Sequence, residues 1–164
     1  MQDPEWSLIC NLLRFIMSLE IIEREIEGIV ILDLSGALTF GNGEGILRDR
    51  IAALCKSGKV NIVLNLKEVN DIDSTGLGTL VFGLAKLRKA GGKLALVNLH
   101  QLHVELFLLT KLSITFEFFG DEHYAVNSFF PDRAVKRFDI LEFVHDQNSP
   151  ELRRELRSRI GLLD

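Results

Sequence analysis

The sequence predicts an α/β fold, with a mixed sheet of about five strands layered with about four helices. Three observations support this class. Short apolar runs rich in Val, Ile and Leu alternate with segments whose apolar residues follow helical spacing. Glycines punctuate the ends of most of these segments. The first two apolar runs follow one another directly, which predicts a hairpin and therefore at least one antiparallel pair.

The hairpin opens the first half of the domain. Strands are expected over 21–26 and 29–34, because these runs flank Glu27-Gly28, a hairpin turn signal. A glycine-rich loop is expected over 36–45. Ile46, Leu47, Ile51 and Leu54 then predict a helical face that ends at Ser57-Gly58, and 60–66 is a near-continuous apolar strand.

The second half continues the alternation. A helix is expected from Asp73-Ser74 to Gly91-Gly92, and a buried strand over 93–98. The remaining predicted elements are a helix over 101–110, a short strand over 115–119 and a helix capped by Asp121 that runs from about 122 to 130.

Two extensions flank this domain, so the expected organisation is 1–17, 18–130 and 131–164. Asp3-Pro4-Glu5 is a typical helix start, and it precedes an apolar stripe. A second interpretation remains open, in which translation starts at Met17. The C-terminal extension holds an apolar segment over 135–144, expected to dock, and an amphipathic helix from Ser149. The two stripes should be buried against the core, a second copy (as a homodimer) or a partner; they comprise Trp6, Ile9, Leu12, Leu13 and Ile16, and Leu152, Leu156, Ile160 and Leu163.

Composition restricts the function classes. The 164 residues include 19 basic and 23 acidic side chains, for a net charge of −4, and 47% are hydrophobic. A globular domain is expected, without the basic excess of nucleic-acid binders. Cys10 and Cys55 fit a reduced compartment. No apolar run approaches the length of a membrane span of about 18 residues, and the start lacks signal-peptide features. We therefore expect a soluble cytoplasmic protein.

The segment from Asn70 to Gly78 is the most informative, because it follows a buried strand and opens a helix. This placement presents the Ser74 hydroxyl where free N–H groups and the helix dipole favour an anion. Gly76 and Gly78 weaken the helix by up to about 1 kcal/mol each relative to Ala. A simpler interpretation is that Asp73 or Ser74 is an ordinary N-cap and the glycines serve packing.

The run Asp73-Ser74-Thr75-Gly76-Leu77-Gly78 resembles the STAS domain of bacterial anti-sigma factor antagonists. The strand before it, Gly91-Gly92-Lys93-Leu94 after it, and Leu34-Ser35-Gly36-Ala37-Leu38 extend the resemblance over about 19–130. The resemblance implies phosphorylation of Ser74 (Thr75 being the second choice) by a partner that is both anti-sigma factor and serine kinase, with reversal by a serine phosphatase. The implied partner-binding residues are Gly36, Thr39, Asn42, Asp71, Asp73, Ser74, Thr75, Gly76, Leu77 and Gly78.

One departure concerns the first loop. This chain has Ala37 and Thr39 where family members often carry acidic residues, and it continues into a long glycine-rich loop. Because the loop belongs to the partner-facing surface of relatives, this departure bears on which partner is bound.

These observations favour a phosphorylation-controlled binding module without enzymatic activity. The alternatives are a constitutive STAS scaffold subunit of a signalling or lipid-transport complex, and a small enzyme using Ser74. The enzyme is disfavoured, since no motif places a base beside the serine. No cofactor or metal is expected: His100 and His103 lack completing ligands and are predicted to be surface residues.

Overall fold

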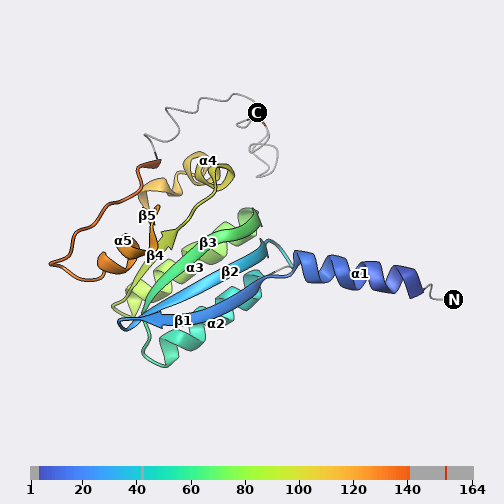
Figure 1. Ribbon diagram of the computed structural model, residues 1–164, viewed down its shortest axis with the longest axis horizontal. Coiled ribbons are helices and arrows are strands. Elements are labelled where there is room, and N and C mark those ends of the chain that lie inside the picture. The colour runs from blue at the N-terminus through green and yellow to red at the C-terminus, as the bar shows by residue number, and fades with distance from the viewer. Residues whose placement is uncertain (1–3, 42, 141–153, 155–164) are drawn as a thin grey trace.

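The computed structural model describes residues 4–41, 43–140 and 154, and it confirms the α/β class (Figure 1). The elements are α1 (Pro4–Met17), β1 (Glu20–Ile26), β2 (Ile29–Leu38), α2 (Glu44–Lys56), β3 (Asn61–Ile72), α3 (Ser74–Lys89), β4 (Lys93–Val97), α4 (Gln101–Leu109), a 3-10 turn (Leu112–Ile114), β5 (Glu117–Phe119) and α5 (Glu122–Asn127).

The sheet is mixed, with the strands in chain order β1-β2-β3-β4-β5. β1 pairs antiparallel with β2, whereas β2, β3, β4 and β5 are mutually parallel. The predicted hairpin is confirmed: Ile26 pairs with Ile29, and the two turn residues between them are left-handed, with φ of 52° for Glu27 and 83° for Gly28. A two-residue hairpin turn of this kind matches the twist of the strands.

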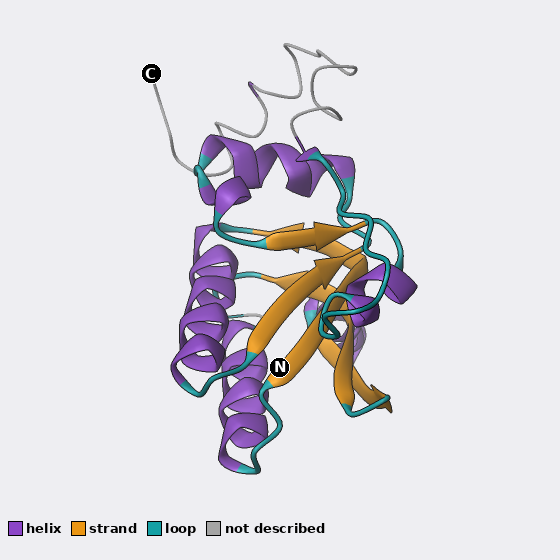
Figure 2. Cartoon of the chain, turned by 90° about the vertical axis from the view of Figure 1, so that its left-hand side faces the viewer, coloured by secondary structure: helices purple, strands orange, loops and turns teal. Residues whose placement is uncertain are grey.

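Helices cover both faces of the sheet. α2 and α3 lie side by side on one face, and α5 lies on the other (Figure 2). The larger apolar core lies under α2, α3 and α4 and includes Leu32, Ile51, Leu64 and Leu80, each with no exposed surface. A smaller core under α5 contains Ile31, Val63 and Ala125 among others. The odd and even positions of β2 and β3 therefore face two separate cores, as the pleat requires.

β2 and β3 extend further than their sequence patterns predicted. The expected loop at 36–45 begins only after Leu38, because Ala37 pairs with Asp71 and Leu38 pairs with Ile72. Gly36, which was expected in this loop, has φ of 101° and lies at an irregularity in the strand register. A glycine inside a strand often marks such a bulge. The bulge keeps the two strand ends paired up to the start of α3.

The two extensions behave differently. α1 projects from the domain, and Trp6 and Leu12 remain 66% and 59% exposed, so burial of its stripe against the domain core is excluded for the described residues. The C-terminal segment docks as predicted as far as it is described: the Phe138 N–H donates to the Phe118 carbonyl at 2.9 Å, and Ile140 is buried. Residues 141–144 and, apart from residue 154, the helix predicted from Ser149 lie outside the described residues. Within the described part, no helix is both long and apolar enough to cross a membrane.

Candidate functional site

The loop after β2 and the motif after β3 meet at one edge of the sheet, because both strands end there. The Asp73 N–H donates to the Leu38 carbonyl at 3.4 Å. In return, the Phe40 N–H donates to Asp73 Oδ2 at 2.9 Å. These two hydrogen bonds tie the loop to the first residue of the motif. The structure therefore brings together two segments that the sequence singled out separately.

Asp73 is the N-cap of α3. Its backbone is extended, with φ of −102° and ψ of −175°, and its Oδ1 accepts from the Gly76 N–H at 2.9 Å. Both carboxylate oxygens are therefore occupied by backbone N–H groups, which are strong partners for a charged acceptor. Of the two capping candidates in the sequence, Asp73 takes this role and Ser74 does not.

Ser74 is exposed at the first position of α3. Among the described residues, its hydroxyl makes no hydrogen bond, so its side chain is not needed to cap the N-terminus of α3. Thr75 is half-buried, and its carbonyl accepts from the Thr79 hydroxyl at 3.2 Å. Ser74 is therefore the more accessible of the two phosphorylation candidates. Its position at the N-terminus of a helix also favours a negative charge there.

The two glycines of the motif have different environments. A Cβ on Gly76 would lie 2.0 Å from the Leu38 carbonyl oxygen, so the helix can approach β2 only with glycine there. Gly78 is exposed, and a Cβ there would meet nothing within 4 Å. Gly76, with the buried Leu77, therefore positions the motif against the sheet. Gly78 leaves the solvent-facing side of α3 flat beside Ser74.

The loop itself is held by the chain that precedes β1. A Cβ on Gly36 would lie 2.1 Å from the Ser18 carbonyl oxygen, and one on Gly43 would lie 2.4 Å from Leu19 Cβ. Thr39 forms a bridge with Gly43, which closes the loop. Gly36 is thus a packing residue at the base of α1. Asn42, a predicted partner-binding residue, lies outside the described residues.

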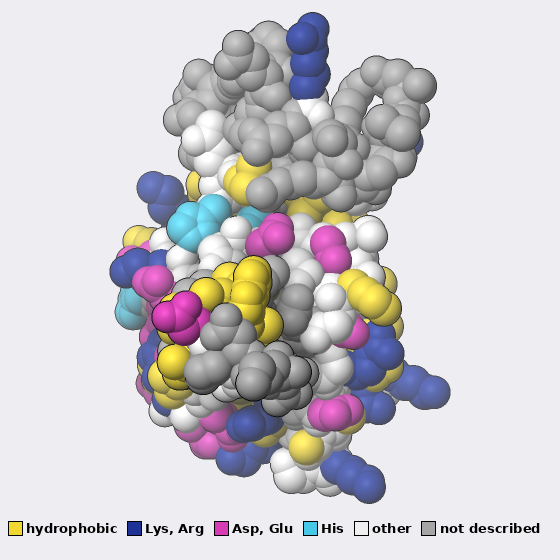
Figure 3. All heavy atoms as spheres, turned by 90° about the vertical axis from the view of Figure 1, so that its right-hand side faces the viewer, with side chains coloured by type: hydrophobic (Ala, Val, Ile, Leu, Met, Phe, Trp, Pro, Cys, Tyr) yellow, Lys and Arg dark blue, Asp and Glu magenta, His cyan; other side chains and the backbone are white. Residues whose placement is uncertain are grey.

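Two exposed apolar side chains lie at this edge. Sequence reasoning missed Phe40, and it placed Ile46 on the apolar face of the predicted helix with Leu47, Ile51 and Leu54, of which Ile46 alone is exposed. Phe40 is 76% exposed in the loop, and Ile46 is 49% exposed on the first turn of α2. Figure 3 looks onto this end of the molecule along α1, which projects toward the viewer. The signal in the sequence was a single aromatic residue between Thr39 and Gly41 in a loop otherwise composed of small residues. Exposed aromatic side chains are typical contacts of protein interfaces.

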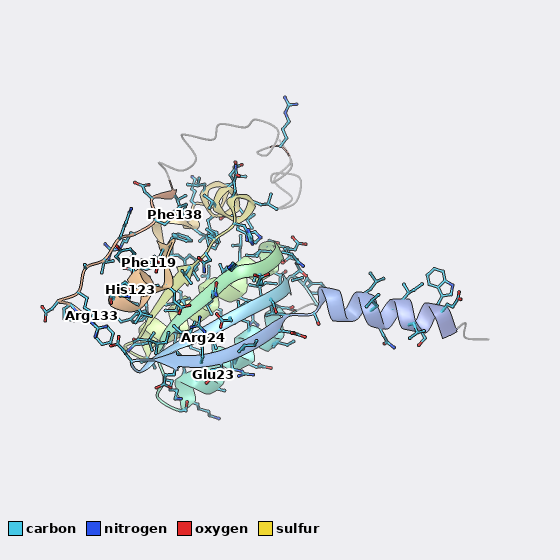
Figure 4. The ribbon with its side chains drawn as sticks, in the orientation of Figure 1. Glu23, Arg24, Phe119, His123, Arg133 and Phe138 are labelled. Atoms are coloured by element: carbon cyan, nitrogen blue, oxygen red, sulfur yellow. The ribbon has the colours of Figure 1, made fainter. Side chains whose placement is uncertain are left out.

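A polar network crosses the sheet on the face that α5 covers. Arg24 lies on β1 (Figure 4). It forms ion pairs with Asp33 of β2, at 2.6 Å, and with Glu122 of α5. Asn65 donates to Asp33 at 2.8 Å and accepts from Asn98 at 3.0 Å. Hydrogen bonding from Arg24 holds the pKa of Asp33 below its usual value, and the two carboxylates raise the pKa of Arg24. This network joins β1 to α5 and takes no direct part in the candidate site.

His100 and His103, which were both predicted to lie at the surface, differ in their exposure. His100 is exposed, and its Nε2 lies 2.5 Å from the Lys67 carbonyl oxygen. His103 is only 3% exposed, so its predicted surface position was wrong. The reason is that α4 packs onto the larger core through the face that carries His103 and Val104. The described residues hold no group of three side chains suited to a metal ion.

Comparison with known families identifies the domain. The sequence profile of the STAS domain matches residues 20–125, which runs from β1 into α5. The chain belongs to the STAS family. The resemblance stated from the Asp73–Gly78 motif is thereby confirmed.

Individual relatives agree with this assignment. The chain is 37% identical over 67 residues to the anti-sigma-B factor antagonist of Bacillus subtilis, a match that spans 41% of this chain and 61% of the relative. A proposed anti-sigma factor antagonist from Thermotoga maritima superposes with a TM-score of 0.62 at 24% identity, over 66% of this chain and 92% of that one. The phosphorylated form of SpoIIAA from Bacillus gives 0.53 at 19% identity, over 66% and 98%. These two structures show the shared fold.

Proposed function

We propose that this chain is a phosphorylation-controlled protein-binding switch of the anti-sigma factor antagonist type. In the unmodified state, the surface formed by Ser74, Gly78 and the loop at Phe40 binds an anti-sigma factor that is also a serine kinase. Phosphorylation of Ser74 releases that partner, and a serine phosphatase restores binding. The chain itself acts as a binding protein, so the phosphoryl-transfer machinery belongs to the partner.

The observation that carries this proposal is the division of labour between Asp73 and Ser74. Asp73 caps α3 with both carboxylate oxygens occupied, which leaves an exposed hydroxyl at the next residue with no role in holding the helix. A serine in that position can be modified without disturbing the fold. With its carboxylate already bound by two N–H groups, Asp73 is also a poor general base for the serine hydroxyl, which argues against hydrolytic chemistry.

Charge supplies the energy of the switch. A phosphate adds about −1.5 to −2 charges at pH 7, beside Asp71 and Asp73. Helix-end stabilisation of that charge is worth only about 0.3–1 kcal/mol. Juxtaposed like charges at an interface cost several kcal/mol, and complete release of a partner requires about 5.5 kcal/mol. We therefore expect repulsion and steric exclusion at the interface to dominate over any change within the domain.

Mass spectrometry of the full chain isolated from its native host tests the acceptor. We expect a species heavier by about 80 Da that maps to Ser74, that disappears in Ser74→Ala and that persists in the neighbouring control Thr75→Ala. Ser74→Ala should cost less than about 0.5 kcal/mol of stability, because Asp73 keeps the cap. Phosphate on Thr75, or a modified Ser74→Ala protein, would contradict the assignment.

Capture of partners from the same host tests the switch. Ser74→Ala should retain the kinase that phosphorylates the wild-type chain, and Ser74→Glu should retain less of it, because one carboxylate charge already opposes docking. Equal capture by both variants would favour a constitutive scaffold instead.

A further inference from the structure

We propose that Phe40 is the residue through which the partner kinase recognises the unmodified chain, by binding its ring in an apolar pocket of the kinase. The inference rests on the proposed function, because it assigns the surface around Ser74 to a serine kinase. It starts from the exposure of the Phe40 side chain, which is 76%. Among the described side chains, no phenylalanine, tyrosine or tryptophan is more exposed. Aromatic side chains are enriched at the centres of protein interfaces.

The exposure of Phe40 does not come from a loosely held backbone. Its N–H donates to Asp73 Oδ2 at 2.9 Å, and the residue before it, Thr39, forms a bridge with Gly43. Gly41, with φ of 75°, and Gly43, with φ of 106°, have the left-handed backbone that this turn of the chain requires. A ring presented by a fixed backbone loses only the freedom of two side-chain torsions on binding, which lowers the entropic cost of association.

Phe40 lies beside the phosphorylation candidate. The carboxylate that accepts its N–H belongs to Asp73, and Ser74 is the next residue. Phosphoryl transfer requires the attacking oxygen to come within about 3–3.5 Å of the phosphorus, so the active site of a kinase must enclose the Ser74 hydroxyl. A kinase that does so also covers the neighbouring loop. This requirement identifies the occupant of the surface at Phe40 as the kinase itself.

The loop offers the kinase an apolar contact and no charge. Residues 34–43 contain no acidic or basic side chain. The bridge between Thr39 and Gly43 brings the start of α2 next to the loop, and there Ile46 is 49% exposed. A kinase surface complementary to this edge is therefore apolar where it meets Phe40, with polar groups at the rim of the interface.

An apolar pocket also makes the contact sensitive to phosphorylation. A phosphate on Ser74 adds about −1.5 to −2 charges at pH 7, and such a charge disrupts a hydrophobic interface. Removing its hydration shell is costly unless charged groups of opposite sign replace the water. Neither 34–43 nor 70–78 contains a basic residue that could do so. Burial of the Phe40 ring and a phosphate on Ser74 therefore oppose each other.

The test measures binding of the full chain to the purified kinase that phosphorylates Ser74. Ser74→Ala is the reference, because it binds without phosphoryl transfer. Adding Phe40→Ala should raise the dissociation constant at least about thirtyfold, whereas adding Phe40→Leu should raise it less than about fivefold. The thermal midpoint should stay that of the reference in both, because the side chain at this position is exposed.

The matched control is Ile114→Ala, because Ile114 is 89% exposed on the 3-10 turn before β5. This change should alter the dissociation constant less than about twofold. The effect of Phe40→Ala should itself change less than about twofold between about 0.1 and about 1 M salt, because the contact carries no charge.

A double-mutant cycle tests the link to phosphorylation. Ser74→Glu weakens binding relative to Ser74→Ala, and this loss should be at least about threefold smaller when Phe40→Ala is also present. The reason is that no buried ring then opposes the carboxylate. Independent effects of the two changes would overturn the link between Phe40 and release.

The outcomes separate this inference from the proposed function. A kinase that phosphorylates Ser74 and binds the Phe40→Ala variant as tightly as the reference would overturn the role of Phe40 and leave the proposed function standing. The same conclusion follows if the effect of Phe40→Ala disappears at high salt, or if Phe40→Ala changes only the oligomeric state of the chain. If no protein of the host phosphorylates Ser74, the proposed function fails and this inference fails with it.

Discussion

At the scale of single residues, the site depends on how one carboxylate is used. Asp73 receives N–H groups from Gly76 in its own helix and from Phe40 in the facing loop. It therefore fixes the loop and the helix start relative to each other. Ser74 is next in sequence, and its hydroxyl makes no hydrogen bond within the described residues. Adjacent positions in one motif thus divide into a structural residue and a candidate for modification.

The two glycines of the motif offer a matched pair of substitutions. Gly76→Ala should destabilise the domain by about 1–3 kcal/mol, because the new Cβ would overlap a backbone oxygen that cannot move aside. Gly78→Ala should stabilise it by up to about 1 kcal/mol, because its Cβ meets nothing and alanine favours the helix. Chemical denaturation of both variants measures the difference. If Gly78→Ala also weakens partner capture, the flat surface beside Ser74 is part of the interface; equal loss of stability in the two variants would contradict this division of roles.

At the scale of elements, β1 is joined to the rest of the domain by more than its hydrogen bonds to β2. Arg24 reaches across to Asp33 and Glu122, so an edge strand, a central strand and the helix on the smaller core share one network. The charges of β1 also leave the edge of the sheet unattractive to another strand. The opposite edge, β5, is covered by the C-terminal segment through Phe138.

This network predicts a pH dependence. Because Arg24 holds the pKa of Asp33 below its usual value, the ion pair contributes stability above the unfolded pKa of about 3.9, and that contribution is lost as the pH falls through the folded pKa. Arg24→Met should lower stability at pH 7 by about 1 kcal/mol, after discounting for the partial exposure of the pair. The difference in the free energy of unfolding between Arg24→Met and wild type should decrease below about pH 4, because Asp33 becomes protonated.

Denaturation curves at about pH 7 and about pH 3 measure this effect. Lys59→Met is the control, because it removes a more exposed ion pair to Glu25, with side chains 47% and 49% exposed. That change should cost less than about 0.5 kcal/mol. If the free energies of unfolding of Arg24→Met and wild type differ by the same amount at both pH values, the contact with Arg24 does not lower the pKa of Asp33.

At the scale of the whole molecule, the structure separates a self-contained domain from a projecting helix. The boundary lies at Leu19, which is 4% exposed and packs against the loop at Gly43. The helix N-terminal to this contact projects from the same edge that carries Ser74.

A shortened chain tests this boundary. A chain that starts at Met17 should retain the thermal midpoint of the full chain, because the described side chains of α1 add nothing to the core. Leu19→Ala in the full chain should instead lose about 2–3 kcal/mol, since it empties a buried site between β2 and the loop. Calorimetry of the two proteins decides; a large loss on removing residues 1–16 would place part of α1 in the folding unit.

The sequence alone was sufficient for the order of the elements, the hairpin at Glu27-Gly28 and the helix start at Asp73. These features depend on local patterns: side-chain periodicity, turn residues and capping residues act over a few positions of chain. The Asp73–Gly78 motif belongs to the same category, and together with the strand before it, the segment 91–94 and the segment 34–38 it indicated the family. Which of Asp73 and Ser74 caps the helix, in contrast, remained open.

Tertiary contacts decided the rest. The ends of β2 and β3 depend on pairing between segments more than thirty residues apart, so Gly36 formed a bulge where the pattern indicated a loop. The burial of His103, the contrast between Gly76 and Gly78, and the bond from Phe40 to Asp73 all depend on what another element places opposite them. α1 shows the same limit, because an apolar stripe predicts that a helix is covered but does not say by which surface. Periodicity describes one segment, and only the packed structure brings a second segment against it.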